Sequence, residues 1–323
     1  MLSACVTTVP PSIPLGPGVT TVPYAKTPRG LFYVEAMVDG QGPFPFVIDT
    51  GASSSALFED FARAQGIFIN EEDQIFVRGL LDVGERPSAR LETFELGNIT
   101  VEDMRVIVLA GGIRDFNVAG VIGLDLFGDG AILMNDRDRT FTIAPPGALN
   151  SDEVRGWDKV PLLRAPEGAP DFGLRFARFK RGPDIDFLTL VDTGSDFSSV
   201  NWVAADLIQP IRGLREQLRR QWEVQGAIGS FRPRALVTFE TLTLGERDWR
   251  DVDVVVLELD SLDVIGAETG PFMIAGANLF ADRSFIVDFE NDLMLMTRDP
   301  RRQRGDVMIL RNPADIRGVI GGP

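Results

Sequence analysis

Short stretches in which hydrophobic and polar residues alternate recur between residues 31 and 299, and they predict a chain built mainly of β-strands. Residues 31–38 alternate, turn, and return through an apolar run over 44–49. Residues 173–180 follow the same plan and return to position 192. Each stretch is typical of a β-hairpin that ends in an aspartate.

The order of elements after the first hairpin recurs after the second. A short helical stretch comes first, and a hairpin that carries a glycine follows, over 77–90 in one copy and 224–235 in the other. The closing segments 123–129 and 276–282 then align without a gap. We interpret this repeat as an internal duplication.

The repeat and the prolines predict the domain organisation. Six prolines between positions 10 and 28 favour extended backbone that packs on nothing, which is typical of a tether. Three further prolines, from Pro161 to Pro170, indicate a connection between the copies. The expected segments are a tether over 1–30, a first lobe over 31–148, a linker over 149–172, a second lobe over 173–299 and a tail over 300–323.

Composition then removes several kinds of chemistry. The 323 residues include 32 basic and 47 acidic side chains, a net charge of −15, which argues against nucleic acid as a partner. The absence of histidine excludes Ser-His-Asp and Cys-His catalysis and most zinc sites. The single cysteine cannot form an internal disulfide, and no run of 18 apolar residues predicts a membrane span. The remaining acid–base groups are carboxylates, lysine, tyrosine and the chain termini, and we expect neither a metal nor a cofactor.

The tripeptide Asp-Thr-Gly occurs at 49–51 and again at 192–194, each time directly after an apolar run. One copy alone is as consistent with a structural turn, because Asp and Thr accept backbone hydrogen bonds and Gly adopts positive φ. Two copies at equivalent points of a duplicated fold favour a functional pair, since a pseudo-twofold axis would bring Asp49 and Asp192 together. Two carboxyls in contact share one proton, and such a pair can hydrolyse an amide without a metal.

This pattern resembles the retropepsin-like and pepsin-like aspartic peptidases over about residues 31–299. The resemblance rests on both Asp-Thr-Gly loops and on a later apolar-apolar-glycine element in each half, at 121–123 and 274–276. It implies a mostly β, bilobal acid-protease fold, with two duplicated β-barrel-like lobes and short helices. In that family the glycine element packs against the catalytic loop.

The resemblance also implies roles for individual residues. Asp49 and Asp192 match the catalytic pair, and the following threonines and glycines match the residues that support it, namely Thr50, Gly51, Thr193 and Gly194. Ser195 stands where pepsin-like enzymes hydrogen-bond the outer carboxylate oxygen, whereas the first loop has Ala52 there. We therefore expect Asp192 to be the more readily ionised of the two.

The glycine-bearing hairpins occupy the positions of the flap that covers the substrate in this family. Backbone at Gly79, Leu80, Gly226 and Ala227 would then bond an extended peptide as an added strand. The chain lacks the flap tyrosine of the pepsins, since its two tyrosines are Tyr24 and Tyr33. The alternative is that both are surface hairpins with no role in binding.

The first residues resemble a bacterial lipobox, because Leu2-Ser3-Ala4 precedes Cys5. Lipidation at Cys5 would make the protein a periplasmic or outer-membrane-anchored lipoprotein of the bacterial cell envelope, attached to the membrane only through its lipid. The basic and apolar regions of a signal peptide are not seen upstream, so an accidental cysteine is the alternative.

These observations predict an aspartic endopeptidase that binds a peptide or protein substrate, and that needs no second copy because one chain supplies both aspartates. Two alternatives stay open. The same fold could be a peptide-binding module that has lost turnover, or a passive scaffold whose carboxyls lie far apart.

Overall fold

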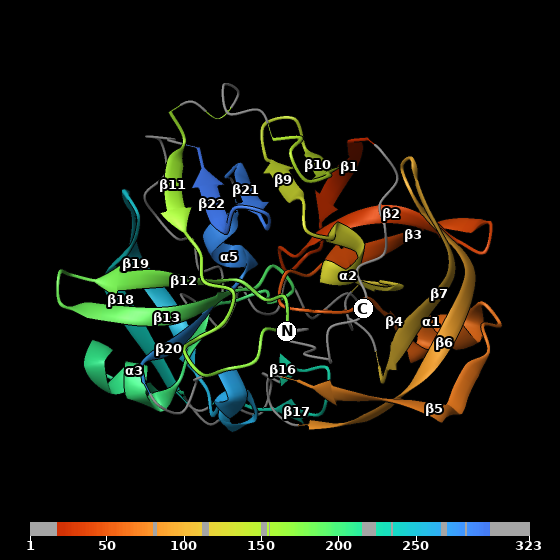
Figure 1. Cartoon of the computed structure of the whole chain (residues 1–323). Coiled ribbons are helices and arrows are strands. Elements are labelled where there is room, and N and C mark those ends of the chain that lie inside the picture. Colours follow the sequence, from red (N-terminus) through yellow and green to blue (C-terminus); the bar gives the residue numbers. More distant parts are fainter. Residues whose placement is uncertain are drawn as a thin grey trace.

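Figure 1 shows a molecule of two β-rich lobes that lie side by side, with a further group of strands above them. The computed structural model describes residues 18–79, 83–111, 116–149, 154, 156–214, 224–233, 235–265, 270–281 and 283–297. Strands form most of the described part of the chain, and the helices are short. The fold class predicted from the sequence is confirmed.

The strands of lobe 1 and of the top of the molecule form one continuous sheet of thirteen strands. Its order is β11-β22-β21-β9-β10-β1-β2-β3-β8-β4-β7-β6-β5. The bounds are β1 Thr20–Lys26, β2 Phe32–Val38, β3 Gln41–Ile48, β4 Ala56–Phe58, β5 Ile69–Arg78, β6 Val83–Leu96, β7 Ile99–Leu109, β8 Gly120–Ile122, β9 Ala131–Asn135, β10 Thr140–Ala144, β11 Asp158–Pro161, β21 Phe285–Asp288 and β22 Leu293–Met296.

Lobe 2 has a sheet of seven strands in the order β12-β13-β20-β14-β19-β18-β15, and two short strands pair separately. The seven are β12 Phe176–Arg181, β13 Ile185–Val191, β14 Ser199–Val200, β15 Arg212–Gly213, β18 Ala235–Leu244, β19 Arg247–Val256 and β20 Phe272–Ala275. The separate pair is β16 Val224–Gln225 with β17 Ser230–Phe231. The helices are α1 Glu59–Ala64, α2 Leu124–Phe127, α3 Trp202–Ile208, the 3-10 helix η1 Asp260–Ile265 and α5 Ala277–Phe280.

The predicted duplication is visible in the strand pairing around each Asp-Thr-Gly. In lobe 1, β3 runs parallel to β8, and β4 pairs with both β8 and β7. In lobe 2, β13 runs parallel to β20, and β14 pairs with both β20 and β19. Equivalent strands therefore place the two motifs at equivalent strand ends.

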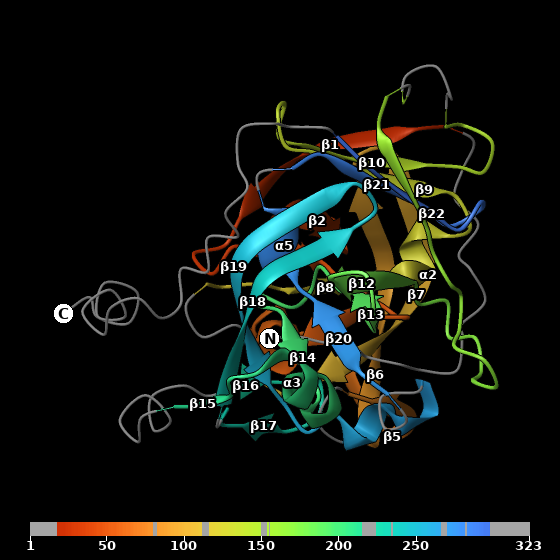
Figure 2. The same ribbon diagram turned by 90° about the vertical axis from the view of Figure 1, so that its left-hand side faces the viewer.

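Strands from both halves meet in the layer at the top of Figures 1 and 2. There β21 of the second half pairs antiparallel with β9 of the first, and β22 continues to β11. The two lobes are thus joined by backbone hydrogen bonds as well as by side chains.

The prediction of a tether over 1–30 is wrong for residues 20–26. These residues form β1, which pairs with β10 on one side and with β2 on the other. Buried and exposed residues alternate regularly along this segment despite its proline, since Thr20, Val22 and Tyr24 are buried while Pro23 is exposed. A proline whose side chain faces outward did not stop the strand, because the buried face carries the packing.

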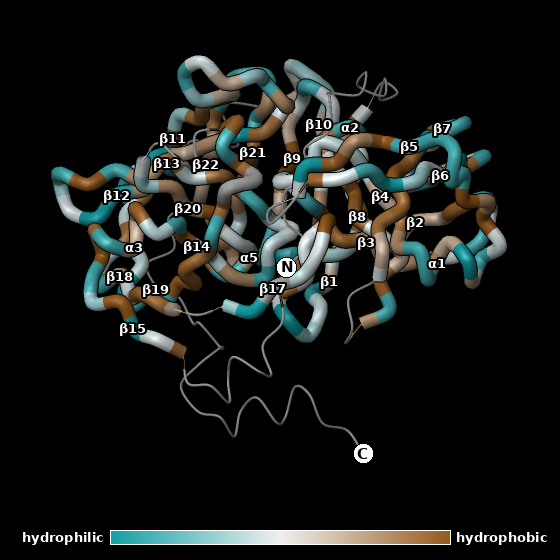
Figure 3. The backbone as a smooth tube through the Cα atoms, turned by 90° about the horizontal axis from the view of Figure 1, so that it is seen from below, coloured by the Kyte–Doolittle hydropathy of each residue, from teal (hydrophilic) through white to brown (hydrophobic). Residues whose placement is uncertain are grey.

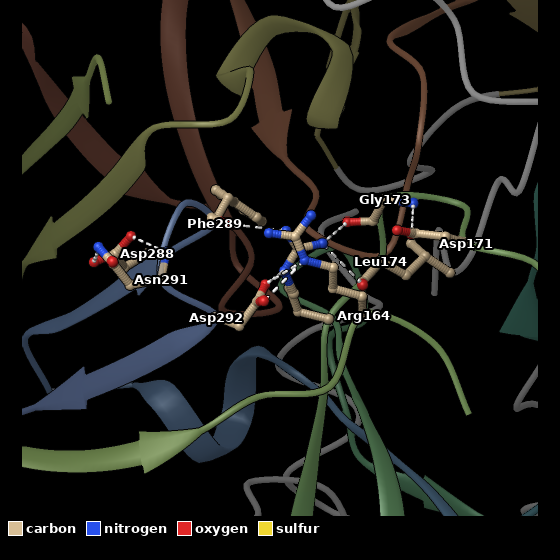
Figure 4. Close-up of polar contacts among 9 residues, drawn as sticks. Arg164, Asp171, Gly173, Leu174, Asp288, Phe289, Asn291 and Asp292 are labelled. Carbon is tan, nitrogen blue, oxygen red and sulfur yellow. Dashed lines mark hydrogen bonds and ion pairs between the residues drawn. The ribbon is translucent and has the colours of Figure 1, made fainter. Parts of the chain in front are cut away.

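The linker predicted over 149–172 also contains structure, because β11 pairs with β22. Asp158, the first residue of β11, is buried and accepts a hydrogen bond from Arg247 of lobe 2 at 2.7 Å. Figure 4 shows a second attachment, in which Arg164 points toward Asp292. The Arg164 guanidinium lies 2.8 Å from the Asp292 carboxylate, and the Arg175 guanidinium lies 3.0 Å from the same carboxylate. Arg175 also donates to the carbonyl of Phe289 at 2.9 Å. The contacts of β11 and of Arg164 therefore attach the connection to the second half of the chain.

The core is one large hydrophobic cluster that runs through both lobes and is rich in phenylalanine. In Figure 3 hydrophobic stretches follow interior strands such as β3, β8 and β14, whereas the hydrophilic segments lie mostly at the outside, as around α1. Among the described residues no helix has the length and apolar character needed to cross a membrane.

Candidate active site

Both Asp-Thr-Gly motifs begin where a buried strand ends. Asp49 follows β3, and its backbone N–H donates to the carbonyl of Ile122 at 3.0 Å. Asp192 follows β13, and its N–H donates to Ala275 at 3.0 Å. Each acceptor belongs to the apolar-apolar-glycine element of the same lobe, so the element expected from the resemblance anchors each loop.

The threonines join the two loops across the lobes. The Thr50 N–H donates to the hydroxyl of Thr193 at 3.1 Å, and the Thr193 N–H donates to Thr50 at 3.1 Å. Each hydroxyl in turn donates to a carbonyl of the opposite lobe, Thr50 to Val191 at 2.8 Å and Thr193 to Ile48 at 2.7 Å. This reciprocal arrangement fixes one loop against the other with buried hydrogen bonds.

The glycines are required because each loop passes directly over the carboxyl group of the opposite lobe. A Cβ at Gly51 would lie 2.5 Å from Cγ of Asp192, and a Cβ at Gly194 would lie 2.2 Å from Cγ of Asp49. Distances this short exclude any side chain at either position. They also show that Asp49 and Asp192 face each other across the pseudo-twofold axis.

The two carboxyl groups are buried, and Asp49 is 2% and Asp192 0% exposed. Burial raises the pKa of Asp49 well above its usual value, and the charge of Asp192 together with a hydrogen bond between the carboxyls raises it further. Backbone N–H groups of Gly51 and Ala52 act in the opposite direction and lower the pKa of Asp49. The titration belongs to the pair, which holds one proton over the range between its two ionisations.

Ser195 does not make the contact expected from the resemblance. Its hydroxyl donates to the carbonyl of Phe197 at 2.7 Å. Because a hydroxyl has a single proton, the predicted hydrogen bond to Asp192 is replaced by one that shapes the second loop. The reason for expecting an easily ionised Asp192 is therefore wrong, and the order in which the two carboxyls ionise stays a prediction.

Four further polar residues, which the sequence analysis missed, hold the glycine elements against the loops. The Ser55 hydroxyl accepts from the Gly123 N–H at 3.0 Å and donates to the carboxylate of Asp125 at 2.7 Å. The Ser198 hydroxyl accepts from Gly276 at 3.0 Å and donates to Asn278 at 2.8 Å. Each serine follows its aspartate by six positions, and this equal spacing was a signal available in the sequence.

The two hairpins proposed as flaps lie close to each other. A Cβ at Gly84 of β6 would lie 3.7 Å from the side chain of Ile228, which belongs to the turn between β16 and β17. Arg78 at the end of β5 lies 3.6 Å from Asp263 of η1. The first hairpin thus reaches lobe 2. Gly79, Gly226 and Ala227 are buried in this region, and the Gly226 N–H closes a turn by donating to Gly229 at 3.0 Å.

Two residues of the predicted site, Leu80 and Cys5, lie outside the described residues. Across the described ranges, no group of three or more Asp, Glu, Cys or His side chains is arranged to hold a metal ion.

A two-lobed β fold with one buried aspartate from each lobe, meeting at a shared axis, defines the acid-protease class. Residues 34–126, which include the first motif and its glycine element, match the family model described as aspartyl protease. The match covers 93 of the 323 residues (126 − 34 + 1) and agrees with the resemblance seen in the sequence.

Solved structures similar to this chain include an aspartic proteinase from Irpex lacteus, with 13% identity, a TM-score of 0.47, and coverage of 87% of this chain and 97% of that one. Conglutin gamma, a basic 7S globulin from lupine seeds, has 12% identity and a TM-score of 0.49, over 88% and 96% of the two chains. Basic 7S globulin from soybean has 11% identity and a TM-score of 0.46, over 88% and 95%. No curated protein matches the chain in sequence.

Proposed function

We propose that the protein is an aspartic endopeptidase whose catalytic residues are Asp49 and Asp192. The observation that carries the proposal is the pair of buried carboxyls from the two lobes, joined by a hydrogen bond and clamped by the reciprocal threonines. Burying two carboxyls side by side has an energetic cost, and groups held at such a cost cluster at functional sites.

The shared proton gives the pair both acid and base character. Asp192 takes a proton from a bound water, and the oxygen of that water attacks the carbonyl carbon of the peptide bond. Asp49 donates its proton to the carbonyl oxygen, so a neutral tetrahedral diol forms. Transfer of a proton to the amide nitrogen then breaks the C–N bond and releases an acid and an amine, with no covalent intermediate on the enzyme.

An extended peptide would bind between the dyad and the two hairpins. Its backbone would add to the hairpin strands near Gly79, Leu80, Gly226 and Ala227, which is how edge strands recognise peptides. The contacts at Gly84 and Arg78 support this arrangement, because they carry the first hairpin over to lobe 2.

Digestion of a peptide library by the wild type and by two variants tests the proposal. Asp49→Asn and Asp192→Asn should each lower cleavage by at least about 10³-fold, since either amide removes the shared proton. A pepstatin-like inhibitor should stop the wild type. The matched control is Asp186→Asn, which also removes a carboxylate but from a surface pair with Lys180, and should leave cleavage unchanged.

Full cleavage by either dyad variant would refute the mechanism. A wild type that binds peptides without cleaving them would favour the inactive peptide-binding module instead. Activity should stay proportional to protein concentration, because each chain contains both aspartates. Lipidation at Cys5, and with it an envelope location, stays a prediction that labelling with a radioactive fatty acid would test.

A further inference from the structure

We infer that Asp125 is a positioning residue that holds the loop bearing Asp49 in its reactive conformation, acting through Ser55. The inference rests on the proposed function, because it concerns the same site. It starts from a difference between two otherwise equivalent hydrogen-bond networks, in which lobe 1 has a carboxylate where lobe 2 has an amide.

The hydrogen-bond network in lobe 1 ends at the carboxylate of Asp125, which is almost inaccessible to solvent. Asp125 in α2 is 7% exposed. Both its oxygens accept from the Ser55 N–H at 2.9 Å, and one accepts from the Ser55 hydroxyl at 2.7 Å. The backbone N–H groups of Leu126 and of Asp125 itself also face the carboxylate. The donors to the Asp125 carboxylate are therefore Ser55, which directly precedes β4, and the backbone of the helical turn that contains Asp125.

Ser55 passes this restraint to the catalytic loop. Its hydroxyl accepts from the Gly123 N–H, and the next residue, Leu124, donates its N–H to the carbonyl of Ala52 at 2.9 Å. Ala52 belongs to the same loop as Asp49, and the N–H groups of Gly51 and Ala52 are the donors that favour the ionised form of Asp49. Asp125 and the catalytic carboxyl are thus linked by consecutive buried hydrogen bonds.

Lobe 2 makes the same connections around a neutral side chain. The Ala277 N–H donates to the carbonyl of Ser195 at 2.7 Å, and the Ser198 hydroxyl donates to the amide oxygen of Asn278. An amide cannot replace the carboxylate in lobe 1. Because both oxygens of Asp125 accept from the Ser55 N–H, an Asn there would turn its NH₂ toward that donor in either orientation. The side chain at position 125 therefore needs a hydrogen-bond acceptor at both of its terminal atoms.

Asp125→Asn tests the inference in the full chain. We expect kcat on a cleaved peptide to fall by about 10- to 100-fold with KM changed less than about threefold, since a small displacement of a catalytic group has this effect on rate. We also expect the alkaline limb of the kcat/KM profile, on which Asp49 loses the proton that it donates, to move to higher pH, because looser N–H donors at Gly51 and Ala52 favour the ionised Asp49 less. In Ser55→Ala, addition of Asp125→Asn should have a smaller effect than it has in the wild type.

The control is Val101→Ala in β7, a buried truncation in the same lobe about 20 Å along the strand from Ile107, which pairs with β4. It lowers stability but should leave kcat and the pH profile of the folded fraction unchanged. An Asp125→Asn enzyme that behaves like Val101→Ala, or that combines additively with Ser55→Ala, would overturn the inference.

A second measurement separates this inference from the proposed function. If the wild type cleaves no peptide, the proposed function fails, and hydrogen exchange at the amides of residues 50–58 decides the positioning role. Faster exchange in Asp125→Asn than in the wild type and in Val101→Ala would support it. Equal exchange in the three proteins would overturn it.

Discussion

At the scale of single residues, burial and a neighbouring carboxyl together oppose the ionisation of Asp49. The carboxyl of Asp49 is buried beside a second carboxyl, so its ionisation is opposed by lost hydration and by repulsion. Its N–H donors offset part of this cost. The remaining cost appears as a pKa raised above the usual 3.8, and a raised pKa ties the stability of the fold to pH.

Asp49→Asn should therefore stabilise the protein near neutral pH. A carboxyl with a raised pKa in the folded state contributes stability below about pH 3.8, and this contribution is lost as the pH rises through the folded-state pKa. The amide does not ionise, so the variant escapes the loss. We expect it to unfold with a free energy about 0.5–2 kcal/mol greater than the wild type at pH 7.

Thermal unfolding of both proteins between pH 4 and pH 7.5 measures this difference. The gap in Tm should narrow toward pH 4, because the wild-type carboxyl becomes protonated there. A gap that stays constant with pH, or a variant that is less stable throughout, would contradict the argument.

At the scale of secondary-structure elements, some strands and loops could be predicted from the sequence pattern and others could not. The paired hairpins and both Asp-Thr-Gly loops were predictable, because alternation and a repeated motif are local signals. β1 and β11 were missed, because proline content suggested unpacked chain, and because one of the two partners of β1, β10, and the partner of β11, β22, lie more than a hundred residues away. The contact of Ser195 was mispredicted, because a hydroxyl beside two acceptors gives no sign in the sequence of which it will use.

The two faces of β1 provide a test at this scale. Val22→Asp places a charge on the buried face between β2 and β10, and should cost about 3 kcal/mol or more of unfolding free energy. Ala25→Asp puts the same charge on the exposed face of the same strand, and should cost less than about 1 kcal/mol. Urea unfolding measures both losses of stability. Small and equal losses in the two variants would mean that residues 20–26 do not pack as a strand.

At the scale of the whole molecule, the halves are alike at the centre and different around it. Thr50 and Thr193 make reciprocal hydrogen bonds of equal length. In contrast, Ala52 of the first half is replaced by Ser195 at the equivalent position of the second, and Asp125 is replaced by Asn278. The first hairpin has strands of ten and fourteen residues, while the second has two strands of two residues each. Duplication set the geometry of the dyad, and each lobe then supports its own aspartate differently.

The pairing of β21 with β9 has a consequence for how the protein is made. Phe285 lies opposite Met134, and these residues are 151 positions apart (285 − 134). The ribosome must release nearly the whole chain before this sheet can close, and contacts so distant in sequence form slowly. A shorter chain that ends at Ala281 should therefore show no cleavage in a peptide-library assay, whereas activity in it would mean that the dyad forms without the shared sheet. Nascent chains would carry both aspartates yet pose no proteolytic hazard to the cell that synthesises them.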